Sequence, residues 1–286
     1  MKYLFMLITA SLCLFTRTEA QSLAYSFEDS LYSPSMDRVM KYSVILPPGY
    51  RDNTERYTTV YLLHGLWGSY KDWVNNTGVI QYASHYRFLI IAPDGHNGWW
   101  TNSKDVKHAM YEDFVMKDLI PAVEKKYRTL STRHGRAIAG LSMGGYGALK
   151  FALKYPGSFF YAASFSGALD VVSGMKDISA SADRNSVGVR SRLDAFGEQP
   201  SAQWTANDVM ALIDSANVKM LPYLYLSVGH SDYLVDASIQ AGTKLRQKGA
   251  AYEMHESIGA HTWLFWDQEI RTVLEKIDRF DPLNVK

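Results

Sequence analysis

Short uninterrupted runs of β-branched and apolar residues, separated by segments with helical spacing, constrain the fold of this chain more than any other feature. Residues 58–63 (TTVYLL) and 88–92 (FLIIA) are two such runs, and each is followed by a glycine-containing turn. A strand without polar alternation is typical of a sheet that is covered on both faces. Between residues 111 and 127 the apolar side chains instead fall mostly on one helical stripe. The alternation predicts an α/β fold in which helices cover both faces of a mostly parallel sheet.

The same alternation continues along the rest of the chain, without an internal repeat, a low-complexity tract or a linker, so we predict a single domain over residues 21–286. Further strands are predicted at residues 39–46, 136–139, 161–165, 223–228 and 251–255, and further helices at residues 144–155, 237–248 and 263–280. Residues 167–206 interrupt the pattern with Ser, Asp, Gly and Arg and show little apolar periodicity. Because an insertion after a strand can lie over the ligand site of an α/β sheet, we interpret this stretch as a cap or substrate-binding insertion. An ordinary surface excursion is the alternative.

Residues 1–20 have the pattern of a secretory signal peptide. Lys2 precedes a mostly apolar stretch over residues 3–15, and Thr18 and Ala20 place small side chains where a signal peptidase reads the chain. We predict cleavage after Ala20 and a secreted or periplasmic mature protein. A membrane anchor is the alternative, although the apolar run is short for a bilayer. Cys13, the one cysteine of the chain, would leave with this segment, so we expect no disulfide in the mature protein.

The charge balance excludes an electrostatic attraction to nucleic acid or to an anionic membrane as the basis of function. The chain has 30 basic and 29 acidic residues, and removal of residues 1–20, which hold Lys2, Arg17 and Glu19, would bring the net charge to zero. The histidines show no spacing typical of metal ligands, so we expect no metal and no cofactor. The expected partner is a small-molecule or polymeric substrate.

The strongest local motif is the run Gly140-Leu141-Ser142-Met143-Gly144, which matches G-x-S-x-G. A predicted strand precedes it and a predicted helix follows it, so the turn between them must be sharp. Such a turn presents the Ser142 hydroxyl at the edge of the sheet, and the flanking glycines permit the strained backbone by lacking side chains. A serine that merely caps a helix in a glycine-rich turn is the alternative.

A serine hydroxyl needs a base within hydrogen-bond reach, and that base needs a third group to hold its tautomer. His261 stands in a glycine-containing loop between the last predicted strand and the last predicted helix, and we interpret it as the base. His255 lies within a strand and is interpreted as structural. His230 follows a strand closely and could shape the neighbouring acid loop.

The orienting acid should also follow a strand. Asp232 lies in the loop after the strand predicted at residues 223–228, and it is our candidate. Asp236 competes with it, but we interpret Asp236 as the cap of the helix that begins near residue 237. The resulting order along the chain is Ser142, Asp232, His261.

A tetrahedral oxyanion needs backbone donors. One should be the amide of Met143, directly after the serine, and the other should come from the loop His64-Gly65-Leu66-Trp67-Gly68, where Leu66 is our choice. A main-chain donor is consistent with an apolar side chain at that position. His64 is interpreted as a brace of this loop and not as a catalytic group.

The blocks YSVILPPGY, HGLWGSYKDW, IAPDG, GLSMGGYGALKFALKYP, VGHSD and GAHTWLFW occur in this order over nearly the whole predicted mature chain. Together they resemble the esterase D, feruloyl esterase and tributyrin esterase group of the α/β-hydrolase superfamily. That group includes carbohydrate esterase family 1, S-formylglutathione hydrolases and the mycolyltransferase antigens. The resemblance implies the three-layer α/β-hydrolase fold and a triad of Ser142, Asp232 and His261, the same residues that the chemistry selects.

The resemblance also implies positions near the substrate. Trp263 lies two residues after the base, and Trp99-Trp100 falls in a loop that borders the acyl pocket in relatives, so all three are candidate substrate-binding residues; simple packing is the alternative.

The sequence as a whole predicts a secreted serine carboxylic ester hydrolase that forms an acyl-enzyme. Its expected substrates are acetyl or feruloyl esters of plant-type polysaccharides, or small acyl esters. An acyltransferase of the mycolyltransferase type with the same triad is one alternative, and a non-catalytic carbohydrate-binding relative is another. An S-formylglutathione hydrolase is disfavoured, because its thiol-ester substrate is cytosolic whereas this chain carries an export pattern.

Overall fold

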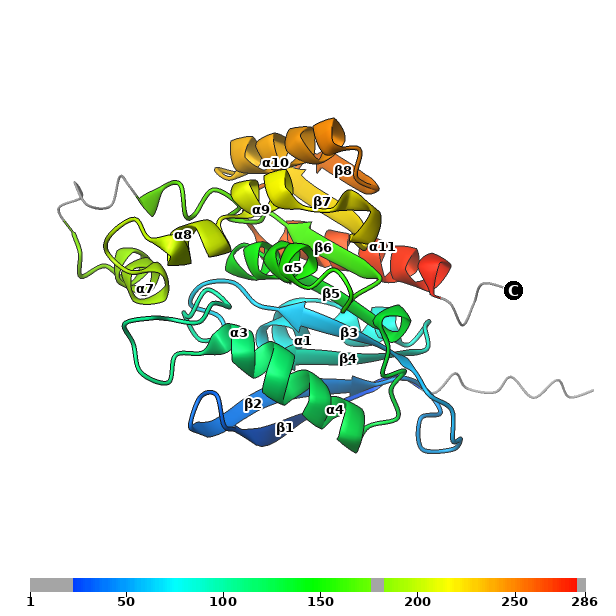
Figure 1. Ribbon diagram of the computed structural model, residues 1–286. Helices are drawn as coiled ribbons and strands as arrows, with labels where there is room; N and C mark the ends of the chain where they lie inside the picture. Colours follow the sequence, from blue (N-terminus) through cyan, green and yellow to red (C-terminus); the bar gives the residue numbers. More distant parts are fainter. Residues whose placement is uncertain (1–22, 176–182, 282–286) are drawn as a thin grey trace, which may run out of the picture.

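A computed structural model describes residues 23–175 and 183–281, so the predicted signal peptide lies outside the described residues. The described chain forms one eight-stranded sheet in the order β1-β2-β4-β3-β5-β6-β7-β8 (Figure 1). The pairs β1–β2 and β2–β4 are antiparallel, and all the other pairs are parallel. The strands are β1 Tyr25–Ser33, β2 Arg38–Leu46, β3 Thr58–Leu63, β4 Phe88–Pro93, β5 Arg136–Leu141, β6 Tyr161–Phe165, β7 Tyr223–Gly229 and β8 Tyr252–Ser257.

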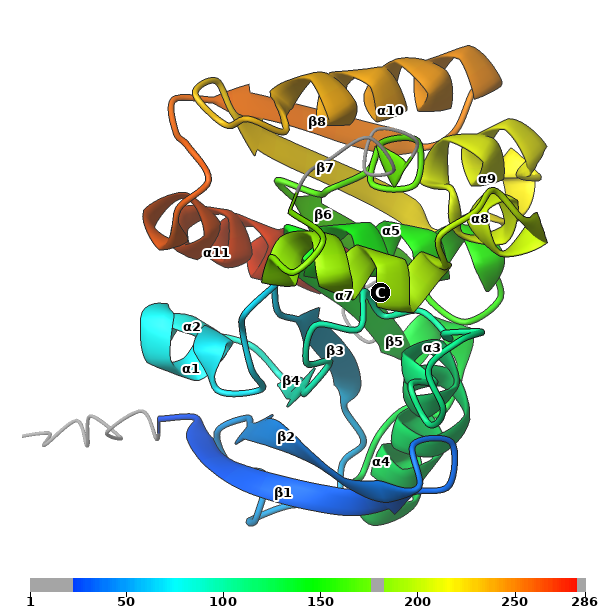
Figure 2. The ribbon, with the colours of Figure 1, turned by 90° about the vertical axis from the view of Figure 1, so that its left-hand side faces the viewer.

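Helices cover both faces of this sheet, which confirms the predicted α/β-hydrolase architecture (Figures 1 and 2). The helical segments are α1 Asp72–Asn76, α2 Val79–Ala83, α3 Tyr111–Asp113, η1 Phe114–Leu119, α4 Ile120–Lys126, η2 Arg133–Gly135, α5 Met143–Lys154, α7 Val187–Phe196, α8 Ala202–Asn207, α9 Val209–Ser215, η3 Val218–Met220, α10 Val235–Lys248 and α11 Trp263–Phe280.

The central strands bury both of their faces because each face meets its own layer of helices. Along β3, Val60 and Leu62 join a buried cluster with α1, α2 and α11, whereas Tyr61 and Leu63 point to the other side and join a cluster with α4, α5, α9 and α10. Successive side chains of a strand point to opposite faces, so an apolar residue is needed at every position. This is why the apolar runs of the sequence indicate the central strands.

The edge strand β1 is the one that the sequence pattern does not predict. It pairs only with β2, and its residues alternate between half-buried and exposed. Polar residues such as Glu28 and Asp29 therefore fit it, and they remove the apolar signal.

The helix predicted at residues 111–127 is present but is not regular. It consists of α3, a π-helical stretch η1 and α4, and Pro121 lies in the first turn of α4. Proline has no backbone N–H to donate, so the regular ladder of hydrogen bonds cannot pass through it, and the helix winds wider just before it.

The stretch at residues 167–206 contains more regular structure than its sequence suggests. Helix α7 occupies ten residues and buries Leu193, Ala195 and Phe196, and α8 follows it. Ser186 caps α7 by accepting a hydrogen bond from the amide of Val189. The weak apolar periodicity of this stretch does not reveal these helices, since the burial of α7 depends on partners elsewhere in the chain. Figure 2 shows α7 in front of the sheet, on the side of the site described below.

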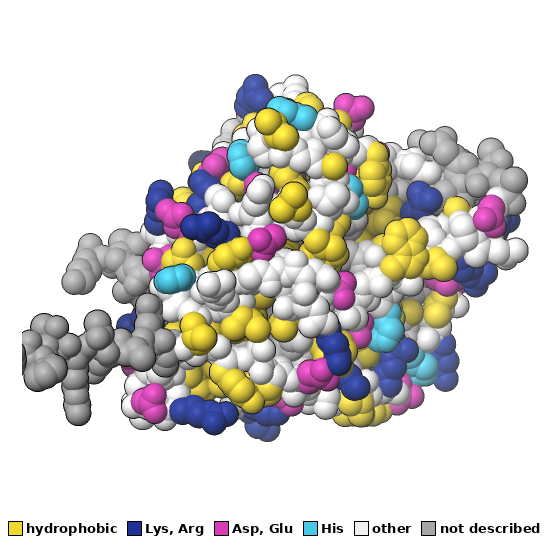
Figure 3. All heavy atoms as spheres, turned by 180° about the vertical axis from the view of Figure 1, so that it is seen from behind, with side chains coloured by type: hydrophobic (Ala, Val, Ile, Leu, Met, Phe, Trp, Pro, Cys, Tyr) yellow, Lys and Arg dark blue, Asp and Glu magenta, His cyan; other side chains and the backbone are white. Residues whose placement is uncertain are grey.

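The charged side chains on the surface of the molecule do not form a patch of one sign on the face seen in Figure 3. Acidic and basic side chains are interspersed on the face seen in Figure 3. Among the described residues, no helix has both the length and the apolar character needed to cross a membrane.

Candidate active site

Ser142 occupies the sharp turn between β5 and α5. Its backbone has φ 53° and ψ −117°, a conformation that an L-residue rarely adopts, and its amide donates to the carbonyl oxygen of Phe165 at 2.9 Å. The flanking glycines are required by close approach: a side chain at Gly144 would collide with the carbonyl oxygen of Leu63, and one at Gly140 would collide with the backbone of Gly144. The turn is therefore held between β3, β6 and α5.

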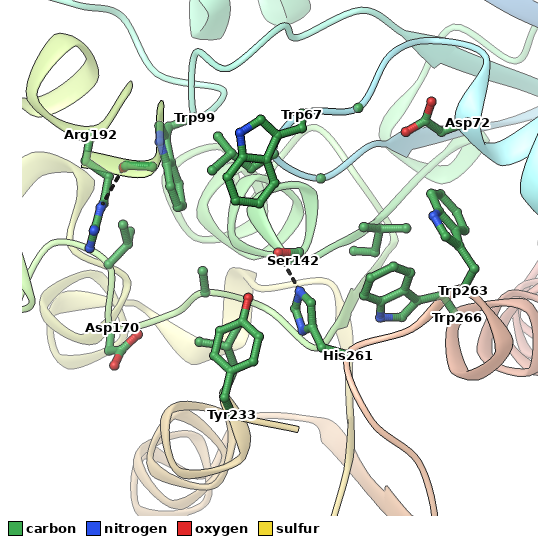
Figure 4. Close-up of a pocket in the computed structure, with 18 residues that line it drawn as sticks. Trp67, Asp72, Trp99, Ser142, Asp170, Arg192, Tyr233, His261, Trp263 and Trp266 are labelled. Atoms are coloured by element: carbon green, nitrogen blue, oxygen red, sulfur yellow. Dashed lines mark hydrogen bonds between the residues drawn. The ribbon is translucent and has the colours of Figure 1, made fainter. Parts of the chain in front are cut away.

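The structure brings Ser142, His261 and Asp232 into one hydrogen-bonded row, as the sequence predicts (Figure 4 shows Ser142 and His261). The His261 Nε2 lies 3.0 Å from the Ser142 Oγ, and the His261 Nδ1 lies 3.0 and 3.1 Å from the two carboxylate oxygens of Asp232. A carboxylate can only accept, so Nδ1 carries the hydrogen and Nε2 is left to accept the hydroxyl hydrogen. This is the tautomer that a general base requires.

The carboxylate of Asp232 is buried but remains ionised. Burial favours its protonated form, but the interactions with His261, Ser166 and the amide of Leu234 outweigh burial and lower the pKa of Asp232 below its usual value. The amide of Leu234 donates to Asp232 at 2.9 Å. An ionised carboxylate behind the imidazole stabilises the imidazolium that forms when His261 takes a proton.

Two aromatic rings enclose the imidazole of His261. Tyr233 lies with its ring centroid 4.6 Å from that of His261, and Trp266 meets His261 edge-on at 4.9 Å. The indole N–H of Trp266 donates to the Ser166 hydroxyl at 3.1 Å, which ties this wall to the loop after β6. The sequence reasoning missed these residues. The helical position of Trp266, three residues after Trp263, was the available signal.

His255 and Asp236, which the sequence analysis rejects as base and as orienting acid, lie outside the hydrogen-bonded row. His255 contacts Glu269 and the Tyr225 hydroxyl, each at 3.0 Å, within β8 and away from Ser142. Asp236 is exposed in the first turn of α10 and makes no capping hydrogen bond, which corrects its predicted role as a cap. It does not contact the base.

The two predicted oxyanion donors belong to residues close to the serine. Leu66 lines the same pocket as Ser142, and Met143 is the first residue of α5. Neither amide donates a hydrogen bond to another residue in the part of the chain that the structure describes. Both N–H groups therefore remain available for an oxygen of the substrate.

His64 braces the loop that carries Leu66. Its Nε2 accepts from the amide of Gly95 at 2.8 Å, so its Nδ1 carries the hydrogen and donates to the carbonyl oxygen of Gly65 at 2.7 Å. Asp94 lies 3.6 Å from the same Nε2, but this nitrogen is already occupied as an acceptor, so we interpret the contact as proximity and not as an ion pair.

Ser142 and His261 open into a cavity of about 530 Å³. Trp99 and Trp263 line this cavity, as predicted, together with Trp67 and Trp266 (Figure 4). Trp100 does not line it, which corrects its predicted role in substrate binding.

The indole of Trp100 is fully buried. It packs against His64, and a side chain at Gly95 or Gly147 would collide with it. Adjacent residues face different directions, and the sequence contained no signal to decide which of the two tryptophans faces the substrate.

Charged and aromatic side chains both line the cavity around Ser142, with Asp72 near Trp263 and Trp99 near Arg192 (Figure 4). Figure 4 shows Arg192 of α7 and Asp170 on one side of Ser142, and Trp263 and Trp266 of α11 on the other. Arg192 was not predicted, because its role depends on the position of α7. Within residues 23–175 and 183–281, no group of three or more His, Cys, Asp or Glu side chains could hold a metal ion.

An α/β-hydrolase fold with a serine at a strand–helix elbow, next to an imidazole and a carboxylate, defines the class of serine hydrolases. The chain belongs to the Esterase family: the family model described as "Putative esterase" matches residues 33–277. The protein is accordingly a carboxylic ester hydrolase of the serine esterase type.

The chain is similar to known proteins in sequence and in fold. The chain is 27% identical to an acetyl esterase of Caldicellulosiruptor saccharolyticus over 78% of this chain and 84% of that protein. It is 26% identical to the diacylglycerol acyltransferase/mycolyltransferase Ag85C of Mycobacterium leprae over 74% of this chain and 71% of that protein. Its fold resembles that of FphF, a fluorophosphonate-binding serine hydrolase of Staphylococcus aureus, with a TM-score of 0.80, 24% identity and coverage of 90% and 99% of the two chains.

Proposed function

We propose that Ser142, His261 and Asp232 are the catalytic triad of this esterase, and that it hydrolyses acetyl and other acyl esters through an acyl-enzyme. The observation that carries this proposal is the unbroken row of hydrogen bonds from the Ser142 hydroxyl through the imidazole to the Asp232 carboxylate. No other histidine among the described residues lies in such a row with a serine.

In the first half of the reaction, the Ser142 Oγ attacks the carbonyl carbon of the ester while its proton passes to the His261 Nε2. The carbon–oxygen bond to the alcohol then breaks, and the imidazolium returns the proton to the departing alcohol oxygen. Asp232 stays ionised and stabilises the imidazolium between these steps.

In the second half, a water molecule gives its proton to His261 and attacks the acyl carbon, and Ser142 recovers its proton as the acid leaves. We assign the amides of Met143 and Leu66 as the donors that stabilise the negative charge on the carbonyl oxygen in both halves. Each donor of this kind contributes on the order of 100- to 1000-fold in rate.

The cavity supports substrates larger than a simple acetate. A volume of about 530 Å³ exceeds what an acetyl group fills, so the remainder is available to a larger acyl group or to the alcohol. The aromatic side chains that line it suit a feruloyl group or a sugar that carries the ester. A panel of aryl acetates, aryl butyrates, methyl ferulate and acetylated xylan tests this: preference for methyl ferulate would support an aromatic acyl group.

An acyltransferase is the second candidate, supported by the similarity to Ag85C. The same triad serves both reactions, because they differ only in whether water or an alcohol attacks the acyl-enzyme. Product analysis with alcohol acceptors in competition with water separates them: free acid as the main product supports the hydrolase.

The substitution Ser142→Ala tests the triad directly. We expect it to lower kcat by at least about 1000-fold and to abolish labelling by a fluorophosphonate probe, because no nucleophile remains. The thermal midpoint should stay within a few degrees, which shows that the fold persists. Most of the turnover surviving in this variant would refute the assignment. A wild-type protein that is not labelled would instead support a non-catalytic carbohydrate-binding relative.

We also propose that the protein is exported, on the basis of the pattern in residues 1–20. N-terminal sequencing of the protein from the culture medium or periplasm should then begin at Gln21. Recovery of an intact N-terminus in the membrane fraction would support the anchor instead.

A further inference from the structure

The wall that Trp99 contributes to the cavity rests on an unfavourable backbone. Trp99 and Trp100 have φ values of 53° and 52°, so two bulky residues in succession are left-handed. This conformation is unfavourable for a residue with a side chain, because it places the Cβ too close to the following carbonyl oxygen. The turn persists because surrounding groups hold it, and these groups determine where Trp99 lies.

The ammonium group of Lys150 is one of these groups, beside the hydrogen bond from the Thr101 amide to the Gly98 carbonyl oxygen that closes the turn. Lys150 extends from α5, the helix that begins directly after Ser142, and it is fully buried. Its Nζ donates to the carbonyl oxygen of Trp100 at 2.7 Å and to the Thr101 hydroxyl at 2.8 Å. The same hydroxyl donates to the carbonyl oxygen of Trp99 at 2.9 Å. One buried cation therefore binds both carbonyls of the left-handed turn, directly at Trp100 and through Thr101 at Trp99.

Glu112 balances the charge of this cation. Its carboxylate accepts from the Lys150 Nζ at 2.9 Å, and its other oxygen contacts Lys154 at 2.6 Å and the Tyr155 hydroxyl at 2.6 Å. Burial opposes ionisation of Glu112, but these partners lower its pKa to about 2. Burial lowers the pKa of Lys150 to about 8, so both groups are charged at neutral pH. Replacing both partners of a buried ion pair by apolar residues of similar volume is often neutral in stability, although removing one partner alone is costly, and this favours a positioning role for the pair.

The indole of Trp99 is fixed separately. Its Nε1 donates to the Ser191 hydroxyl of α7 at 3.1 Å, and its ring packs against Tyr146 of α5 and Phe196 of α7. The backbone end of Trp99 thus depends on Lys150 and its indole end on α7. Loss of either anchor would displace the wall of the cavity without touching Ser142.

We propose that Lys150 is a positioning residue of the esterase, which sets the selectivity of the cavity by holding the left-handed Trp99–Trp100 turn. It acts through Trp99 and does not contact substrate. The proposal rests on the proposed function only in taking this cavity as the substrate site. It assigns Lys150 a role in KM and in selectivity, and leaves the attack by Ser142 to the triad.

A double-mutant cycle tests the route through Trp99. Lys150→Met, Trp99→Ala and the double variant are compared on 4-nitrophenyl esters from acetate to octanoate and on methyl ferulate. For the ester that Trp99→Ala affects most, we expect Lys150→Met to raise KM by about tenfold with a much smaller change in kcat. In the Trp99→Ala background the Lys150→Met substitution should change KM by less than about twofold, because coupled residues are not additive.

Lys154→Met is the matched control. Lys154 lies one turn further along α5 and also pairs with Glu112, but it does not touch the turn. We expect its selectivity profile to match the wild type. Thr101→Val removes the hydroxyl that accepts from Lys150 and donates to the Trp99 carbonyl, but it leaves the direct bond from Lys150 to the Trp100 carbonyl, so it should reproduce part of the Lys150→Met effect. If Lys150→Met does not fold, Thr101→Val is used in its place to test the proposal.

Three results would overturn the proposal: additive effects of Lys150→Met and Trp99→Ala, an equal shift in Lys154→Met, or a selectivity profile that none of these substitutions alters. Failure of the triad assignment would appear differently, as activity that survives in Ser142→Ala. Labelling by the fluorophosphonate probe should persist in Lys150→Met, because the triad is intact there.

Discussion

Two imidazoles near Ser142 have different hydrogen-bond partners, and this difference decides their roles. Both nitrogens of His64 are engaged by the backbone, at Gly65 and Gly95, so His64 has no free acceptor. His261 has one nitrogen held by Asp232 and the other directed at the Ser142 hydroxyl. The role of a histidine as base or brace is thus set by its hydrogen-bond partners.

The orienting role of Asp232 gives a prediction at this scale. Asp232→Asn should lower kcat/KM for 4-nitrophenyl acetate by about 10³- to 10⁴-fold, because an amide in place of the carboxylate permits the wrong tautomer of His261. The exposed Asp236 provides the matched control, and Asp236→Asn should remain within about twofold of the wild type. Equal losses in the two variants would argue against Asp232 as the orienting acid.

At the scale of elements, the turn between β5 and α5 is the most constrained connection. The two glycines of the motif let the turn pass against the end of β3, and Ser142 accepts the left-handed backbone between them. This packing explains the two glycines of the G-x-S-x-G motif, because a side chain larger than hydrogen has no room at either position.

Gly144→Ala should therefore destabilise the protein by more than about 3 kcal/mol, or prevent folding, because the added methyl group collides with the Leu63 backbone. The free energy of unfolding in urea measures the loss. At Gly157 an added methyl group meets nothing within 4 Å, so Gly157→Ala should be close to neutral. A folded Gly144→Ala protein of wild-type stability would contradict the described elbow.

At the scale of the whole molecule, two apolar layers separated by the sheet carry the fold, and one buried ion pair crosses the layer that contains α5. Lys150 and Glu112 connect the nucleophile helix to the helix that begins at Tyr111. This link joins the cavity wall to the core, so the stability of the molecule and the shape of the site share one contact.

The ion pair of Lys150 and Glu112 predicts how the free energy of unfolding changes at low pH. The pKa of Glu112 is lowered from 4.5 to about 2, so its contribution to stability is fully present above about pH 4.5 and is lost as the pH falls towards 2. The loss is on the order of 3 kcal/mol. The difference in the free energy of unfolding between the wild type and Glu112→Gln should therefore shrink over this range. Parallel pH profiles of the two proteins would contradict this assignment, since Lys150 stays protonated throughout the range.

Much of the fold could be predicted because buried strands leave a direct signal. The strands β3 and β6 have the predicted bounds, since every position in them is buried and all but Ser164 are apolar, aromatic or β-branched. The edge strand β1 and helix α7 could not be predicted with equal ease. Each of these two elements buries only part of its surface. Which of its positions need an apolar residue depends on the neighbours that the fold places beside it, so its sequence shows no regular apolar pattern.

The residues of the row Ser142, His261 and Asp232 could be selected from the sequence because each follows a strand at the same edge of the sheet. The rest of the site could not. Tyr233, Trp266 and Arg192 reach the cavity through the orientation of loops and helices, which a spacing pattern does not record.

The sequence by itself determined which chemical groups follow which strands, and therefore the class of reaction, because strand order and turn chemistry are local properties. Only the tertiary structure decided that Trp99 faces the cavity and Trp100 the core. The two residues are adjacent and chemically identical, and their backbones are both left-handed. Contacts with Lys150 and Ser191, far away in the chain, distinguish them.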